Sequence, residues 1–200
     1  MVVPEAVAQM AVQTVVHTNP LLCPYFWAFL STLGWAMGML TVGSTSLGRY
    51  MLYGFTGSML AQIPRLILPL WFVQQPRFEA PVAVVALGAI LCLTALFFAF
   101  PGLGVKIYTR PTHMEPLVTS GLYGMVRHPI LFSNIVWPLG WSAICGSWVG
   151  IALVPVWFLL VFLMSFIEED RMIETYGDSY RAYRRQVPRL IPFLKFRRAK

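Results

Sequence analysis

The chain alternates long apolar stretches with short polar ones, and this pattern predicts an all-α integral membrane protein. A membrane-spanning helix needs about 20 mostly apolar residues. About five such spans are expected, near residues 20–42, 50–74, 80–101, 129–145 and 147–167. The last two come from one run without Asp, Glu, Lys or Arg, which at about 1.5 Å per residue is too long for a single helix across a bilayer. We divide that run at the turn Cys145–Ser147.

The polarity changes abruptly after the fifth span, at the acidic cluster Glu168–Asp170. Beyond it, apolar and aromatic residues recur at spacings of three and four between Met172 and Val187, which predicts an amphipathic helix along the membrane interface. We expect Gly177 to break this helix and Asp178 to cap its second half. The residues expected to face lipid headgroups are Arg181, Arg184 and Arg185.

Composition excludes an ordinary soluble domain. Hydrophobic residues make up 58% of the 200 residues and charged residues 12%, against about 45–50% and about 25% in soluble domains. A soluble globule of this size could not bury so much apolar surface, whereas a bilayer can accept it. The three cysteines lie in apolar segments without metal-ligand spacing, so no metal site is predicted.

The net charge of +7 is concentrated in the second half of the chain, where twelve of the fifteen Lys and Arg residues lie. Most of them follow the last apolar stretch, which favours a cytoplasmic tail beside the membrane over a nucleic-acid-binding surface. Five spans would place the two termini on opposite sides. The sequence therefore predicts a multi-pass membrane protein with a cytoplasmic C-terminus and no nucleic-acid partner.

The segment Pro116–Pro129, PLVTSGLYGMVRHP, stands just before the longest apolar run and ends in Arg127, His128 and Pro129. If the run folds into a hairpin, Arg127 and His128 meet the acidic cluster on one membrane face. Pro129 suits the first turn of a helix, whose free N–H groups form an anion-binding corner together with Arg127. A ligand carboxylate could dock there.

Each of these polar residues also has a simpler interpretation. Glu168 and Glu169 could mark the membrane boundary, or one of them could bind ligand hydroxyls or an ammonium group. His128 could be an ordinary hydrogen-bonded residue. Arg65, in the apolar sequence AQIPRLILPLW, could extend to the interface, pair with Gln62 or face a cavity, and its structural and substrate-contact roles stay equally open.

The motif, the long apolar hairpin and the following EEDRMIETYGDSYRAYRRQVPRLIP together resemble the isoprenylcysteine carboxyl methyltransferase and phospholipid methyltransferase superfamily of integral membrane enzymes. The similarity covers about residues 101–193. It divides a single membrane domain, 1–200, into divergent spans in 1–100 and a methyltransferase-like, cofactor-binding half in 101–200. The resemblance implies S-adenosylmethionine as methyl donor and a lipophilic small molecule or lipid as acceptor.

The resemblance also implies which residues bind the cofactor. Carried over position by position, they are Tyr108, Glu115, Pro116, Leu117, Val118, Tyr123, His128, Pro129, Ile130, Leu131 and Glu168. The candidate catalytic residues are Arg127 and Glu169. Methyl transfer is an in-line displacement in which the protein aligns the donor and acceptor and excludes water. A protonated amine or thiol acceptor would also need a base, and the sequence does not select one.

Two positions depart from the family pattern. Many members have a tyrosine where this chain has Leu131, and the prenylcysteine enzymes have an arginine where it has Met164. Both departures argue against a prenylcysteine substrate. The alternatives are a related membrane redox or isomerase protein, which the missing tyrosine favours and which could bind haem, and a non-catalytic membrane scaffold.

Overall fold

The computed structural model describes residues 19–43, 47–104 and 116–192, and over these residues the protein is helical, as the sequence predicts. A 3₁₀ turn, η1 (Pro20–Leu22), precedes seven α-helices. These are α2 (Pro24–Gly43), α3 (Leu47–Ile67), α4 (Val82–Gly104), α5 (Leu122–Met125), α6 (Pro129–Ile144), α7 (Trp148–Tyr176) and α8 (Asp178–Gln186).

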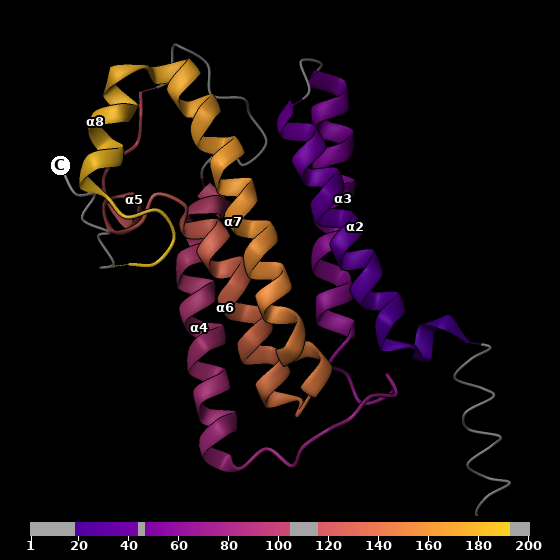
Figure 1. The fold of residues 1–200 in the computed structure, drawn as a ribbon. Coiled ribbons are helices and arrows are strands. Elements are labelled where there is room, and N and C mark those ends of the chain that lie inside the picture. The colour runs from indigo at the N-terminus through magenta and orange to yellow at the C-terminus, as the bar shows by residue number, and fades with distance from the viewer. Residues whose placement is uncertain (1–18, 44–46, 105–115, 193–200) are drawn as a thin grey trace, which may run out of the picture.

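The long helices form two groups (Figure 1). Helices α2 and α3 lie side by side, and α4, α6 and α7 form the second group, with α5 and α8 at one end of it. Glycines bring the backbones of α4 and α6 together. A Cβ atom at Gly88 would lie 2.7 Å from the carbonyl oxygen of Gly140, and one at Gly140 would lie 2.6 Å from that of Gly88. Small residues at helix contacts of this kind are common in membranes.

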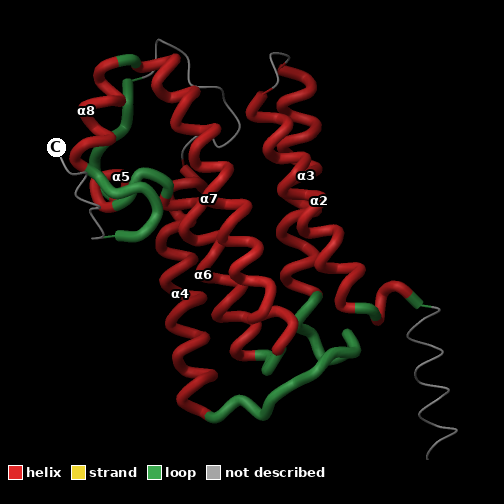
Figure 2. Tube along the Cα trace, viewed as in Figure 1, coloured by secondary structure: helices red, strands yellow, loops and turns green. Residues whose placement is uncertain are grey.

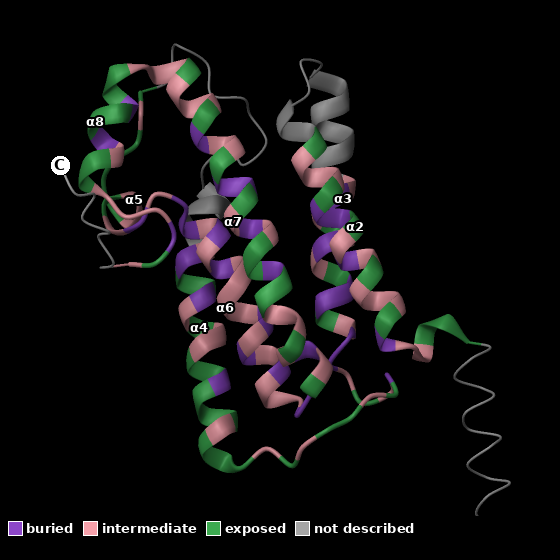
Figure 3. Ribbon diagram, in the orientation of Figure 1, coloured by how far each residue is buried: buried purple, intermediate pink, exposed green. Residues whose placement is uncertain are grey.

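Two of the described helices are long and apolar enough to cross a bilayer, α4 over Val82–Ala99 and α7. Large apolar side chains remain exposed along α4, including Leu93, Leu96 and Phe97, and the exposed positions follow the outer face of that helix in Figure 3. An exposed apolar face of this extent is unusual in a soluble protein and suits contact with lipid. The number of spans and the side on which each terminus lies stay predictions.

The second predicted span, 50–74, is wrong at its C-terminal end. Helix α3 ends at Ile67, and the chain then continues as turns and extended backbone to α4 (Figure 2). Pro69 explains the stop, because it lacks the N–H that a continuing helix needs and disfavours helical backbone at the residue before it. Leu68 and Val73 in this connection are fully buried, so it is packed against the helices.

The predicted hairpin turn between the fourth and fifth spans is confirmed, since α6 ends at Ile144 and α7 begins at Trp148. Gly146 has a φ of 64°, and a Cβ there would collide with the carbonyl oxygen of Phe78. Only glycine fits this close approach. Arg77 secures the same end of the bundle by donating to the carbonyls of Pro69 at 2.9 Å and Cys145 at 3.0 Å.

The region after the fifth predicted span differs in part from the expectation. Helix α7 does not end near the acidic cluster but continues to Tyr176, so the first half of the predicted amphipathic helix belongs to α7. The break at Gly177 is confirmed. Asp178 is not the cap: Gly177 occupies the N-cap position, and Asp178 is the first helical residue, where its charge favours the helix N-terminus. Its carboxylate accepts from Arg181 at 2.8 Å.

Candidate functional site

The α6–α7 hairpin brings the motif and the acidic cluster together at one end of the bundle, as the sequence predicts. His128 precedes α6, and its Nδ1 lies 3.0 Å from Glu168 Oε2 and its Nε2 3.4 Å from Glu169 Oε1. Arg127 NH1 lies 2.8 Å from the same Glu169 oxygen. Residues forty positions apart in the chain thus meet because α6 and α7 run in opposite directions through the bundle.

Glu169 is the centre of a buried charge network. Its side chain is 1% exposed. One oxygen contacts Arg127 and His128, while the other accepts from Arg189 at 2.8 Å and lies 3.7 Å from Arg184. A carboxylate is tolerated at this depth only when cations and hydrogen bonds compensate for its lost hydration. Both oxygens of Glu169 are already engaged in that way.

The segment after α8 folds back over the motif. The backbone N–H of Arg127 donates to the carbonyl oxygen of Pro188 at 2.9 Å, and that of His128 donates to the carbonyl oxygen of Arg189 at 3.2 Å. The guanidinium carbon of Arg189 lies 3.7 Å from the ring centroid of Phe166 on α7, a cation–π contact. Backbone pairing, an ion pair and ring stacking therefore hold this segment against the site.

Two tyrosines connect α5 and α8 beside the network. The hydroxyl of Tyr183 donates to the backbone carbonyl of Tyr123 at 2.6 Å. Burial raises the pKa of Tyr183 to about 12, against the opposing effect of Arg127. Burial and the charge of Glu168 raise the pKa of Tyr123. Both phenols are therefore neutral hydrogen-bond donors at pH 7, and Tyr123 lies within the electrostatic reach of Glu168.

The surroundings of His128 favour its cationic form. Burial alone would lower its pKa, but hydrogen bonds with Glu168 and Glu169, and the charges of both, outweigh burial and raise the pKa above its usual value. Each ring nitrogen faces a carboxylate oxygen, so the protonated ring can donate on both sides. The two carboxylates therefore fix the charge and the orientation of the ring together.

Among the described residues, three arginines and His128 surround two carboxylates in this cluster, so positive charge exceeds negative charge. Within the same part of the chain, Arg127 Nε and Arg189 NH1 are buried without a hydrogen-bond partner. Helix α6 begins next to them, with Pro129 in its first turn and no side chain capping its N-terminus. Unused donors, surplus positive charge and a free helix N-terminus are suited to an anionic group such as a carboxylate.

The other predicted cofactor residues lie around this network or outside the described part of the chain. Tyr108 and Glu115 lie outside the described residues. Pro116 and Val118 are exposed and Leu117 is half-buried, in extended backbone that leads to α5. The residues in the first turn of α6 are Pro129, Ile130 and Leu131.

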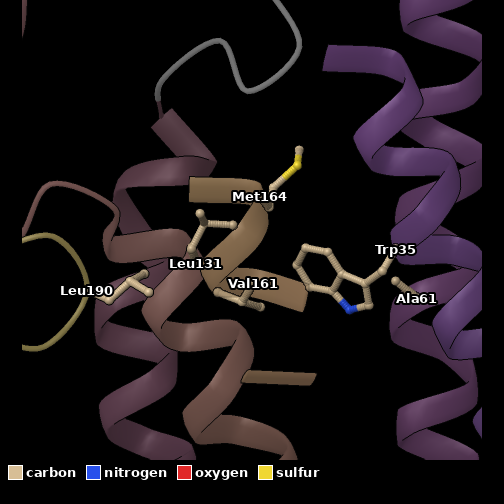
Figure 4. Close-up of a cluster of buried hydrophobic side chains, with 6 residues drawn as sticks. All are labelled: Trp35, Ala61, Leu131, Val161, Met164 and Leu190. Carbon is tan, nitrogen blue, oxygen red and sulfur yellow. The ribbon is translucent and has the colours of Figure 1, made fainter. Parts of the chain in front are cut away.

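Leu131 also reaches the apolar core below the network (Figure 4), where it packs with Val161 and Met164 of α7 and with Leu190. The glutamate that remains accessible is Glu168, whose side chain is 32% exposed. Glu168 therefore has a surface to offer a ligand, whereas Glu169 does not.

Sequence reasoning missed Arg189 and assigned Arg184 to lipid headgroups. Arg189 lies in the tail sequence VPRLIP, which carries part of the family resemblance but no expected role. The available signal was the surplus of arginines after the acidic cluster Glu168–Asp170. Spacing along the chain could not reveal that Pro188 and Arg189 pair with the backbone of the motif, because that contact joins segments about sixty residues apart.

Comparison with known proteins agrees with the geometry. The family model for phospholipid methyltransferases matches residues 82–179, which include α4, α6, α7 and the motif. A protein-S-isoprenylcysteine O-methyltransferase of Schizosaccharomyces pombe is 35% identical over 109 residues, covering 54% of this chain and 46% of that protein. A methanethiol S-methyltransferase of Bradyrhizobium diazoefficiens is 30% identical over 136 residues, covering 62% of this chain and 46% of that protein.

A third relative carries a different activity in its name. The Delta(14)-sterol reductase of Mus musculus is 32% identical over 84 residues, covering 39% of this chain and 19% of that protein. In all three cases the chain covers less than half of the relative's own length. No solved structure matches the chain.

Proposed function

Because residues 82–179 belong to the phospholipid methyltransferase family of membrane methyltransferases, we propose that this protein transfers a methyl group from S-adenosylmethionine to a lipophilic acceptor at the membrane. The family uses this methyl donor, and residues in the described site suit it. The observation that carries the proposal is the cluster of His128, Glu168 and two arginines with unused donors at the start of α6.

When bound, S-adenosylmethionine supplies an electrophilic methyl group on a sulfonium centre, and the protein needs only to hold and orient it. Arg127, Arg189 and the first turn of α6 would hold the carboxylate of the donor. Glu168 would accept hydrogen bonds from its ammonium group or ribose hydroxyls. Leu117 and Val118 would contact the adenine ring, as an apolar face beside free backbone groups suits an aromatic base.

Glu169 has a positioning role in this proposal, not a catalytic one. Its carboxylate is buried and holds Arg127, His128 and Arg189 in place. The apolar cluster of Leu131, Val161, Met164 and Leu190 lies next to the network and keeps water from the bilayer side of the site. A lipophilic acceptor would approach from that side.

Binding of S-adenosylhomocysteine, measured by isothermal titration calorimetry on the purified protein in detergent, tests the proposal. We expect the parent protein to bind it, and the variants His128→Ala and Glu168→Gln each to bind at least about tenfold more weakly, since each removes a charged hydrogen-bonding group. The matched control is Glu174→Gln, an exposed glutamate on the same helix, which should bind as the parent does. Undiminished binding by both site variants would overturn the site assignment.

A second candidate is a reductase, which the match to the sterol reductase favours. A reductase that binds haem at this site would need a ring nitrogen of His128 as an axial ligand of the iron, yet both nitrogens face carboxylate oxygens. An absorption spectrum of the purified protein tests the haem form of the second candidate, because a Soret band would support a haem protein and contradict the methyltransferase proposal.

A further inference from the structure

Arg65 on α3 is a buried cation away from the candidate cofactor site. It is fully buried, which rules out one of the three alternatives that the sequence left open, extension of its side chain to the interface. Its guanidinium carbon lies 5.0 Å from the ring of Trp35 on α2 and 4.7 Å from that of Trp157 on α7. The cation is thus held between two indole rings that come from the two helix groups. Cation–π contacts of this kind are favourable for arginine.

The hydrogen bonds of Arg65 satisfy only part of its guanidinium. Its Nε donates to Ser31 Oγ at 3.1 Å, and its NH1 donates to the backbone carbonyl of Asn134 at 3.1 Å. Its NH2 is buried without a hydrogen-bond partner among the described residues, and so are the indole N–H groups of Trp35 and Trp157. Three donor groups around one cation are therefore unused.

No carboxylate among the described residues forms an ion pair with Arg65; its contacts are a hydroxyl, a carbonyl and two rings. A buried charge without a counter-charge is costly, and ionisable groups inside membrane segments usually contact a ligand or another charge. Compensation by a bound anion would satisfy both the charge and the unused donors. The chemistry of the site therefore calls for a negatively charged ligand.

The position of Arg65 connects it with the candidate cofactor site. Asn134, its partner on α6, is six residues beyond His128, the N-cap of that helix, which is about 1.7 turns or about 9 Å along the axis. The core residues Leu131, Val161 and Met164 lie near this stretch, where Trp35 extends from α2 toward Val161 (Figure 4). Arg65 thus lies deeper in the bundle than the charge network, on the side from which a lipophilic acceptor would come.

We propose that Arg65 binds a carboxylate group of the lipophilic acceptor, with the two indole N–H groups as additional donors. This proposal rests on the proposed methyl transfer. A planar carboxylate suits a guanidinium that lies against two indole rings, since it can accept hydrogen bonds from the unused NH2 group in the guanidinium plane.

Arg65 belongs to α3, outside the residues 82–179 that match the family. Acceptor recognition by this residue would therefore be a property of this chain's first half. It would also supply a cation on the acceptor side of the site, where Met164 provides none.

The test is a titration of the purified full chain in neutral detergent with dodecanoate, dodecanol and dodecyl phosphate, followed by tryptophan fluorescence. Trp35 and Trp157 flank the guanidinium, so binding should change their emission. We expect dodecanoate to bind at least about tenfold more tightly than dodecanol, since a charge-assisted hydrogen bond distinguishes them. Equal affinities would overturn the proposal, as would tighter binding of dodecyl phosphate.

Variants assign the binding to the residue. Arg65→Gln should reduce dodecanoate affinity to that of dodecanol, Arg65→Lys should retain part of the preference, and the control Arg185→Gln, on the exposed face of α8, should bind as the parent does. An Arg65→Gln variant with undiminished preference would contradict the proposal. If Arg65→Gln does not fold, the proposal is tested by comparing the affinities for the three ligands between the parent and Arg65→Lys. An Arg65→Lys variant with an unchanged preference for dodecanoate would then contradict it.

Measuring S-adenosylhomocysteine binding shows whether a failed test concerns the acceptor site at Arg65 or the proposed methyl transfer. Arg65→Gln should bind S-adenosylhomocysteine as the parent does, because Arg65 lies outside the charge network. Absence of S-adenosylhomocysteine binding in the parent would contradict the methyltransferase proposal, while the preference for dodecanoate would still stand or fall on its own titration.

Discussion

Glu169 and Arg65 are both buried charges in a helical membrane protein, yet their surroundings are opposite. Glu169 contacts three arginines and His128, and both of its oxygens are engaged. Arg65 contacts two rings, a hydroxyl and a carbonyl, and one of its nitrogens has no partner in the described part of the chain. The difference indicates that the first charge holds the structure together, whereas the second is left for a ligand.

Removal of the paired charge of Glu169 should have the largest effect on the unfolding free energy. Glu169→Gln leaves Arg127, Arg189 and His128 without their shared counter-charge, and loss of one partner of a buried ion pair costs about 3–5 kcal/mol. We expect a loss of unfolding free energy in that range, measured by titrating SDS into detergent micelles. The matched control is Glu168→Gln, whose carboxylate is partly exposed and, among the described residues, contacts His128 alone, so its loss should be clearly smaller. Equal losses would remove the special position of Glu169.

Removal of the unpaired charge should affect stability less. Arg65→Met keeps an unbranched side chain between the indoles, loses two hydrogen bonds and relieves the desolvation of a buried cation. Since apolar replacement of buried charges is often neutral or stabilising, we expect a change below about 1.5 kcal/mol in the same SDS titration. A loss as large as that of Glu169→Gln would show that Arg65 is a structural residue and would cancel the contrast.

The sequence predicts the helical elements better than their ends. Apolar length and the Cys145–Ser147 turn were enough to locate α4, α6 and the start of α7. The C-terminal ends failed where local chemistry decides: Pro69 stops α3 early, and the acidic cluster does not stop α7. A helix can continue through acidic residues when cations from other segments of the fold pair with their carboxylates. The pattern of apolar and polar residues along the chain does not contain that information.

The candidate site was also predicted only in part from the sequence. The hairpin argument brought Arg127 and His128 to Glu168 and Glu169, because antiparallel helices must bring their ends together. It could not distinguish the two neighbouring glutamates, since which of them is buried depends on how α7 is rotated against α6. The roles of Arg189 and Arg65 depend on contacts between distant segments, which hydrophobic periodicity does not encode.

The smallest expected effect on the unfolding free energy comes from deprotonation of His128, whose ring lies between Glu168 and Glu169. Glu168 and Glu169 on α7 face its ring, Arg127 and Arg189 face Glu169, and the pKa of His128 is raised. A raised pKa in the folded state means that the stabilisation is complete below the unfolded value of about 6.5 and is lost as pH rises through the folded value. The unfolding free energy should therefore decrease as pH is raised from neutral.

His128→Gln keeps hydrogen-bonding groups but does not titrate, so subtracting its pH profile from that of the parent isolates the histidine from every other titrating group. A parent profile that runs parallel to that of His128→Gln would mean that the ring is neutral in the folded protein. The network around Glu169 would then contain one cation fewer, and its contrast with Arg65 would rest on the arginines alone.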